Sequence, residues 1–394
     1  MRNTCRVLVV GTCLTLGAMA ARAVSQASGQ PQVGRVTVLR TPDGGIQPQV
    51  ALDANGGIQL IYFKGEPAHG DLFYVRIGAD GAFSRPVQVN STPGSAIATG
   101  AMRGGHLAIG RNGRVHVAWH GSDKAMPRAD GNATPVLYSR MNAAGNAFEP
   151  PRNVVRQRLE GLDGGTVAAD ASGNVYVAWH AFQPGMRGEE DRRVWIARST
   201  DDGRTFARES AASAAATGTC GCCAVGAFAD RRGTLYLLYR SATELVHRDK
   251  YLLTSRDKGL TFASDMIQEW NVGACPMSTS SLSESESGVL AAWETGGQVQ
   301  WLRIDPNTGA RSQIIAAPGS SKSRKHPVVT SNGRGETILV WTEGTGWNKG
   351  GGLAWQVFDN AGKTIGAEGR AEGVPAWSMA AVAARQDGSF MIVY

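Results

Sequence analysis

One pattern recurs along most of the chain: a turn rich in Asp, Asn or Gly, followed by an apolar strand that ends in an aromatic residue. The copies cover 57–62, 114–119, 174–179 and 234–239, and further ones end at Trp293, Trp341 and Tyr394. Successive aromatic ends lie about 50–60 residues apart, close to the repeat length of β-propellers. Period-two alternation within each copy predicts half-buried strands that pack between neighbouring blades. The repeat therefore predicts an all-β propeller in a single domain.

The blade count follows from the number of strand pairs. The pattern contains seven inner pairs and six outer pairs, so seven blades are favoured and six are the alternative. We expect the seventh blade to combine the C-terminal segment 376–394 with the N-terminal strand 36–40. Such a closure removes the exposed edges of an open sheet. The propeller is therefore expected over residues 35–394.

Two turns carry the sharper motif S-x-D-x-G-x-T-F. The matching residues are Ser199, Asp201, Gly203, Thr205 and Phe206, and again Ser255, Asp257, Gly259, Thr261 and Phe262. In a hairpin turn the Asp carboxylate accepts backbone N–H bonds and Gly supplies a positive φ. Degenerate copies occur at 78–83 and 142–148. The motif resembles the Asp box of the sialidase-like (BNR-repeat) β-propellers, and the resemblance covers nearly all of 35–394.

The resemblance implies that the Asp boxes are structural and lie opposite the ligand site. Sialidases of this family use an Arg triad, an Asp acid/base and a Tyr nucleophile. The nearest match to their first Arg is Arg40 in an Arg-Thr-Pro sequence, and no tyrosine lies between Tyr251 and Tyr394. The catalytic residues are therefore unassigned, with Arg40, Arg240 and Glu294 as weak candidates. An exo-α-sialidase-like glycosidase or a lyase is the alternative activity, because glycoside hydrolysis needs two facing carboxylates.

Four of the six cysteines fall in two short segments, Cys220-Gly221-Cys222-Cys223 and Cys275-Pro276-Met277. In propellers of the resembling family, the inner strand of each blade starts on the top face, which carries the ligand site. The two segments immediately precede the inner strands of blades 4 and 5. His326 and His106 take the matching places in blades 6 and 2. We therefore expect sulfur and imidazole donors around one mouth of the channel.

Three kinds of chemistry fit this cysteine cluster. Disulfides are expected in an oxidising compartment, but every complete pairing of the four cysteines includes a short bond inside 220–223, so one bridge from the cluster to Cys275 is the simpler arrangement. A soft-metal site would use Cys220, Cys222, Cys223, Cys275 and Met277, with His106 and His326 as weaker ligands, and would select copper or zinc. A redox-active dithiol is the third possibility.

The N-terminal segment 1–23 reads as a secretory signal: two arginines, an apolar stretch and an Ala-Arg-Ala cleavage site ending at Ala23. It contains Cys5 and Cys13, and 24–34 would be a linker. Removing its three arginines leaves a net charge of about +4, too diffuse for a nucleic-acid surface. We expect a periplasmic or secreted monomer without a membrane span. Its top face would bind a small molecule, a glycan or a metal, or serve as a protein-binding scaffold.

Overall fold

The computed structural model describes Met1 and residues 35–394, apart from 101–102, 129–134, 158–159 and 321–322. The expected signal segment, its two cysteines and the linker thus lie outside the described residues. In the described part the only helical elements are three short 3-10 turns: η1 (Pro42–Gly44), η2 (Arg111–Gly113) and η3 (Ala215–Thr217). No helix there is long and apolar enough to cross a membrane.

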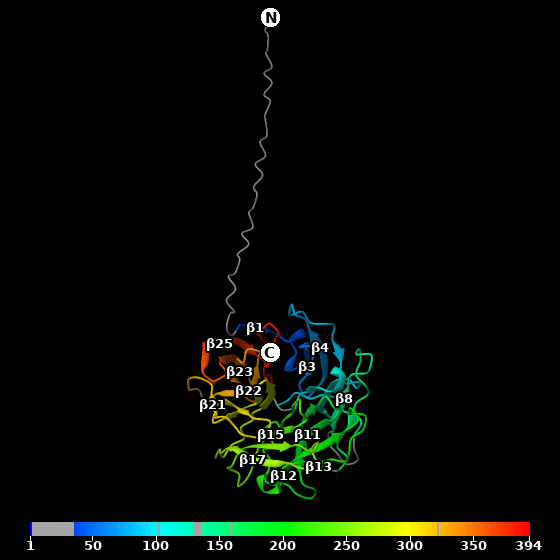
Figure 1. The fold of residues 1–394 in the computed structure, drawn as a ribbon. Helices are drawn as coiled ribbons and strands as arrows, with labels where there is room; N and C mark the ends of the chain where they lie inside the picture. The colour runs from blue at the N-terminus through cyan, green and yellow to red at the C-terminus, as the bar shows by residue number, and fades with distance from the viewer. Residues whose placement is uncertain (2–34, 101–102, 129–134, 158–159, 321–322) are drawn as a thin grey trace. The chain divides into compact units, whose positions relative to one another are not determined.

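Seven sheets surround a common centre, and each is one blade (Figure 1); six are antiparallel and the seventh contains one parallel pair. Blade 1 contains β2 (Ile46–Leu52), β3 (Ile58–Glu66), β4 (His69–Ile77) and β5 (Val87–Gln88). Blade 2 contains β6 (His106–Ile109), β7 (Val115–His120), β8 (Val136–Arg140) and β9 (Arg152–Asn153). Blade 3 contains β10 (Asp163–Ala169), β11 (Val175–Phe182), β12 (Arg192–Ser199) and β13 (Ser210–Ala211).

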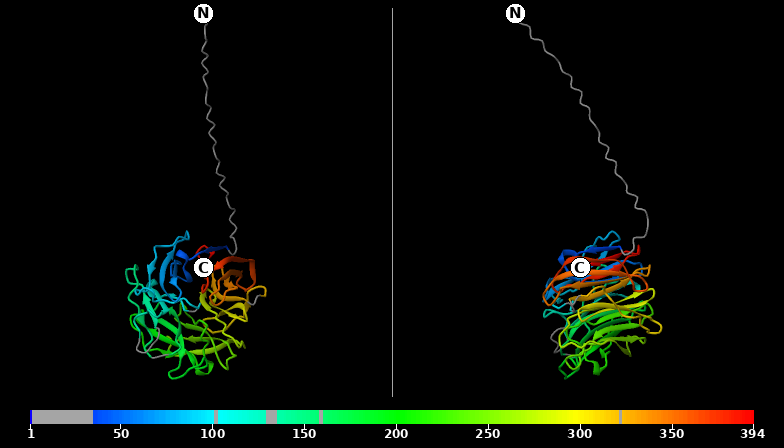
Figure 2. Two further views of the ribbon diagram at one scale, coloured as in Figure 1. Left: turned by 180° about the vertical axis from the view of Figure 1, so that it is seen from behind. Right: turned by 90° about the vertical axis from the view of Figure 1, so that its left-hand side faces the viewer.

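The second half of the ring repeats this order. Blade 4 contains β14 (Gly226–Ala229), β15 (Leu235–Arg240), β16 (Lys250–Ser255) and β17 (Ala263–Gln268). Blade 5 contains β18 (Ser280–Ser285), β19 (Gly288–Thr295), β20 (Gln298–Ile304) and β21 (Ile315–Ala316). Blade 6 contains β22 (Arg324–Ser331), β23 (Thr337–Glu343), β24 (Gly351–Phe358) and β25 (Thr364–Val374). The first strand of each blade contacts the first strands of both neighbouring blades, so these strands line the centre of the ring, which Figure 2 shows from behind and from the side.

Blade 7 closes the ring with strands from both ends of the propeller. It consists of β26 (Ala381–Ala384), β27 (Phe390–Val393) and β1 (Val36–Leu39). β1 runs parallel to β27, with Val36 opposite Phe390 and Leu39 opposite Val393. Both the seven-blade count and the closure predicted from the repeat are confirmed.

The recurrent aromatic residues are the main filling between blades. The four tryptophans Trp119, Trp179, Trp293 and Trp341 are completely buried. Trp179, for example, packs in one apolar cluster with Val136 and Val154 of the preceding blade. Apolar burial of this kind contributes about 25 cal/mol per Å². The aromatic residues that recur at strand ends in the sequence are therefore the residues that pack between blades.

The two S-x-D-x-G-x-T-F segments form the turns after β12 and β16, at the face where the inner strands end. In the first, Asp201 accepts hydrogen bonds from the Thr205 amide (2.9 Å), the Thr205 hydroxyl (2.7 Å) and the Ser199 hydroxyl (2.7 Å). Asp257 has the same three donors in the second turn. The residue before the motif glycine and the glycine itself both have positive φ, 65° and 74° at Asp202 and Gly203.

Candidate functional site

The cysteine loop of blade 4 is held by backbone hydrogen bonds at the top face, which we define as the face where the inner strands begin. The Cys220 amide donates to the carbonyl of Arg240 at 2.9 Å. The Gly221 amide donates to the carboxylate of Glu189 at 2.9 Å. Just after the loop, the Ala224 amide donates to the carbonyl of Ser278 in blade 5 at 3.1 Å. The loop is thus fixed to both neighbouring blades before β14 starts.

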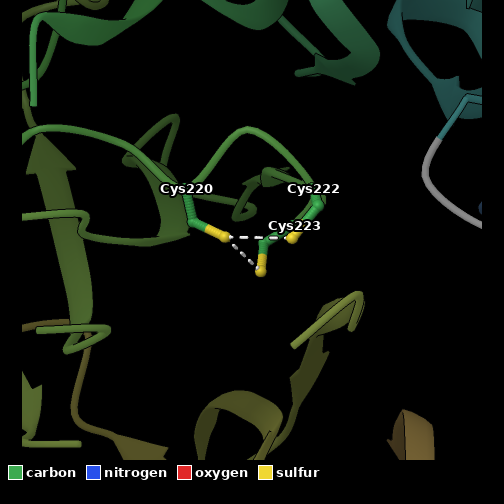
Figure 3. A group of neighbouring side chains, drawn as sticks. All are labelled: Cys220, Cys222 and Cys223. Atoms are coloured by element: carbon green, nitrogen blue, oxygen red, sulfur yellow. Dashed lines mark hydrogen bonds between the residues drawn. The ribbon is translucent and has the colours of Figure 1, made fainter. Parts of the chain in front are cut away.

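Three cysteine sulfurs converge inside this loop (Figure 3). The Sγ atoms of Cys220, Cys222 and Cys223 all lie within 4.8 Å of one another. The Cys220 Sγ is 2.8 Å from that of Cys223 and 3.4 Å from that of Cys222. Cys220 therefore occupies the centre of the group.

Cys222 is also bonded to Cys275 by a disulfide with a Cα–Cα distance of 6.3 Å. This bond joins blade 4 to blade 5, and it is the single bridge to Cys275 that the sequence favoured over two disulfides, one of them within 220–223. Cys220 and Cys223 are free and buried. In this structure, consequently, two of the five predicted sulfur ligands form a bridge and two are thiols.

Positive charge surrounds the two thiols. Burial raises the pKa of the Cys223 thiol, but the hydrogen bond from Cys220 and the positive charge of Arg240 outweigh it, so the pKa is lowered to about 7. The hydrogen bond to Cys223 and burial raise the pKa of Cys220. Burial, together with the charge of Arg240, lowers the pKa of Lys250 to about 7. The Lys250 ammonium donates to the Ser280 hydroxyl of the next blade.

Met277 lies three residues before β18, whereas His326 is the third residue of β22, so His326 stands inside the first strand of its blade and not before it as the register predicted; both residues have a positive φ. Their φ angles are 48° and 53°, in the left-handed region that few non-glycine residues adopt. His326 Nδ1 lies 3.2 Å from the Thr279 hydroxyl, and the Lys325 ammonium donates to the Pro276 carbonyl at 2.6 Å. These contacts bring the starts of blades 5 and 6 together. His106 stands at the first position of β6, where burial lowers its pKa to about 4.

The weak catalytic candidates are occupied by backbone contacts. Arg40 donates to the carbonyls of Gly373 and Glu372 and stacks on Tyr394. The Arg240 guanidinium is buried, donates to the carbonyls of Arg248 and Glu294, and stacks on Trp270. One carboxylate oxygen of buried Glu294 accepts the Gly297 amide at 2.6 Å.

A charged network in blades 2 and 3 is built around Asp163, which no motif in the sequence marked. Arg103 donates two hydrogen bonds of 2.8 Å to the carboxylate of Asp163, which also lies 3.2 Å from Nδ1 of His120. Burial raises the pKa of Asp163, but the bonds from His120 and Arg103 lower it well below its usual value. Asp163 is the first residue of β10, so the register that located the cysteines would also have found it.

Arg192 connects this network to the cysteine loop. Its guanidinium lies 3.4 Å from Nδ1 of His180, the residue opposite Asp163 in the pairing of β10 with β11. A Cβ placed on Gly221 would come within 3.0 Å of the same guanidinium, so the glycine allows this close approach. Charged side chains of blade 3 therefore contact the sulfur loop of blade 4.

Comparisons with known proteins place this fold among the sialidase-like propellers. No protein-family model matches the chain, and no curated protein matches its sequence. Among solved structures, a protein of unknown function from Dyadobacter fermentans DSM 18053 superposes with a TM-score of 0.53 and 14% identity, over 79% of this chain and 94% of that one. The Hadza microbial sialidase Hz136 gives 0.52 and 12%, over 83% and 74%.

The α-L-arabinanase of Penicillium chrysogenum gives a TM-score of 0.51 and 14% identity, over 84% of this chain and 98% of that one. At identities this low the similarity shows the fold alone. The chain thus has a sialidase-like, seven-bladed β-propeller fold.

Proposed function

We propose that this propeller is an exported protein that binds a soft metal ion at its cysteine loop, with Cu(I) preferred and zinc second. The observation that supports this is the convergence of three Sγ atoms within 4.8 Å. Thiolate ligands select Cu(I) and zinc over harder cations. The disulfide fits an oxidising compartment.

The metal-binding form would be the reduced one. Reduction of the Cys222–Cys275 bond makes Cys222 available as a third thiolate ligand and Cys275 as a fourth. Cys275 is two residues from Met277, which has a thioether. A thioether is a soft ligand that Cu(I) accepts more readily than zinc. The positive charges of Lys250 and Arg240 next to Cys223 would offset the negative charge of several thiolates. Arg192, next to Cys220, would act in the same way.

The test is metal titration of the reduced protein under anaerobic conditions, with competing chelators to fix the free Cu(I) and Zn(II) concentrations. We expect one Cu(I) per chain, and at least a hundredfold weaker binding in Cys223→Ser. Met277→Leu should weaken Cu(I) binding about tenfold and leave zinc binding nearly unchanged. Met186→Leu, which changes an exposed methionine, is the matched control.

Two outcomes would contradict this function. One is the absence of stoichiometric metal on the reduced protein. The other is equal Cu(I) affinity in the wild type and Cys223→Ser. Metal-free protein that hydrolyses an α-sialoside or an arabinan would instead favour the glycan-active alternative, for which the buried ionised carboxylate of Asp163 at the top face is the supporting observation.

A further inference from the structure

The four cysteines of blades 4 and 5 differ in their exposure to solvent. Cys275 is exposed and Cys222 is half-buried, whereas Cys220 and Cys223 are buried. The exposed and half-buried sulfurs form the bridge, which we call the outer pair. The buried thiols Cys220 and Cys223 form the inner pair. The two pairs thus differ both in oxidation state and in access to solvent.

Cys220 lies close to a cysteine of each pair. Its Sγ lies 3.4 Å from Cys222 of the outer pair and 2.8 Å from Cys223, its own partner. Reacting atoms in a near-attack arrangement are about 3–3.5 Å apart. A bridge that served only to tie two blades would not need a dithiol in contact with it.

We propose that the cysteine loop is a thiol–disulfide exchange centre, in which the inner pair reduces the outer bridge. This activity is separate from metal binding and does not require it.

The electrons of the exchange balance within the protein. In the first step the Cys220 thiol gives its proton to the Cys223 thiolate, to which it donates a hydrogen bond, and its Sγ attacks that of Cys222. The Cys220–Cys222 bond forms and the Cys222–Cys275 bond breaks. The electron pair leaves on Cys275, which takes a proton from solvent because it is exposed. In the second step Cys223 gives up its proton and attacks Cys220, and Cys222 leaves as a thiolate and takes up a proton. The inner pair thus loses the one proton that it held, and the outer pair gains two, the second of which comes from solvent.

The product has its dithiol at the surface. Cys275 can then attack an external disulfide, of a small molecule or of a polypeptide, and form a mixed disulfide while one external thiolate leaves. Attack by Cys222 on Cys275 restores the outer bridge and releases the second external thiolate. Two electrons have then moved from the buried pair to the external disulfide. The proposed substrate class is therefore a disulfide that can reach the rim of blades 4 and 5.

The experiment follows the position of the bridge in time. The purified chain is fully reduced, freed of reductant, and treated with one equivalent of diamide in the presence of Cu(I) and Zn(II) chelators. Samples are quenched with acid, alkylated with a maleimide and mapped as peptides, which separates these four cysteines from Cys5 and Cys13. We expect the Cys222–Cys275 bridge early. It should then decay as the Cys220–Cys223 bridge grows, with a rate constant independent of protein concentration.

Two variants test which cysteine acts in each of the two exchange steps. In Cys220→Ser the release of Cys275 should slow at least tenfold, because the central nucleophile is missing. In Cys223→Ser the nucleophile of the second step is missing and the Cys220 proton must go to solvent, so Cys275 should be released more slowly and a Cys220–Cys222 bridge should accumulate. The second variant keeps the test valid if the first fails to fold.

The proposal is overturned if the outer bridge stays unchanged for hours in the wild type. It is also overturned if Cys275 is released as fast in Cys220→Ser as in the wild type. Because chelators are present throughout, failure of exchange is distinct from failure of metal binding, which the titration measures separately.

Discussion

The ring is joined in two different ways, at blade 7 and between blades 4 and 5. At blade 7 the contact is generic: β1 pairs in parallel with β27, and Val36 and Val38 pack against an apolar cluster. Between blades 4 and 5 the contact is specific, with a disulfide and a buried lysine that reaches across to Ser280. An apolar strand suffices to close a propeller. The sulfur junction goes beyond what closure requires, which points to a chemical role.

The largest effect is expected from breaking the closure. A chain that lacks residues 1–40 loses β1, leaves the edge of β27 unpaired and exposes apolar residues of blade 7. We expect it to lose at least about 5 kcal/mol of unfolding free energy, because the half-buried side chains of β1 are lost and buried apolar residues of β27 become exposed, and a fully buried Val, Leu, Ile or Phe contributes about 1.5–3 kcal/mol. Urea denaturation followed by tryptophan fluorescence measures this loss. The matched control lacks only 1–34 and keeps β1, and equal stability of the two chains would contradict the closure.

Loss of the Cys222–Cys275 disulfide should lower the free energy of unfolding by less than loss of β1. The Cys222–Cys275 bond spans 53 residues, so its loss releases entropy of the unfolded chain and should lower stability by about 2–4 kcal/mol. The comparison uses a parent chain with Cys220→Ser and Cys223→Ser, in which the bridge cannot exchange, and sets the oxidised parent against the same chain with Cys275→Ser in one denaturant series. The parent under a reducing agent should fall to the level of the Cys275→Ser chain. A bridge that contributes nothing would leave all three curves superimposed, and the junction would then have no stabilising role.

The smallest effect is expected within a single blade. Asp201→Asn weakens the hydrogen bonds of one turn and should cost about 1 kcal/mol at neutral pH. Burial raises the pKa of Asp201, but bonds from Thr205 and Ser199 lower it from 3.8 to about 2. The stabilisation is therefore complete above pH 3.8 and is lost as the pH falls through 2. Unfolding curves between pH 2 and 7 should show the two proteins converging in acid, whereas the exposed-site control Asp265→Asn should match the wild type throughout.

The fold was largely readable from the sequence because the packing of blades imposes a repeat. The aromatic strand ends are four tryptophans and three tyrosines, all buried, and the seven inner strand pairs required a shared seventh blade. The same register placed Cys220 and Cys275 at neighbouring strand starts. Position along a repeat thus carries three-dimensional information whenever every repeat folds alike.

The site chemistry was less readable because it depends on contacts that no register specifies. Which cysteine bonds to Cys275 depends on loop geometry of a few ångströms. The charge around Cys223 comes from Arg240 at the end of β15 and Lys250 at the start of β16, and no pattern in the sequence links either residue to the cysteines. The pairing of Arg103 with Asp163 likewise joins residues 60 positions apart.

Blade 7 has three strands, whereas each of the other six sheets of the described chain has four. The ring therefore has one segment with fewer hydrogen-bonded strands, whereas blades 4, 5 and 6 are linked by the disulfide and by the Lys325–Pro276 contact. We expect any opening of the ring to begin at blade 7, in a different part of the ring from the sulfurs.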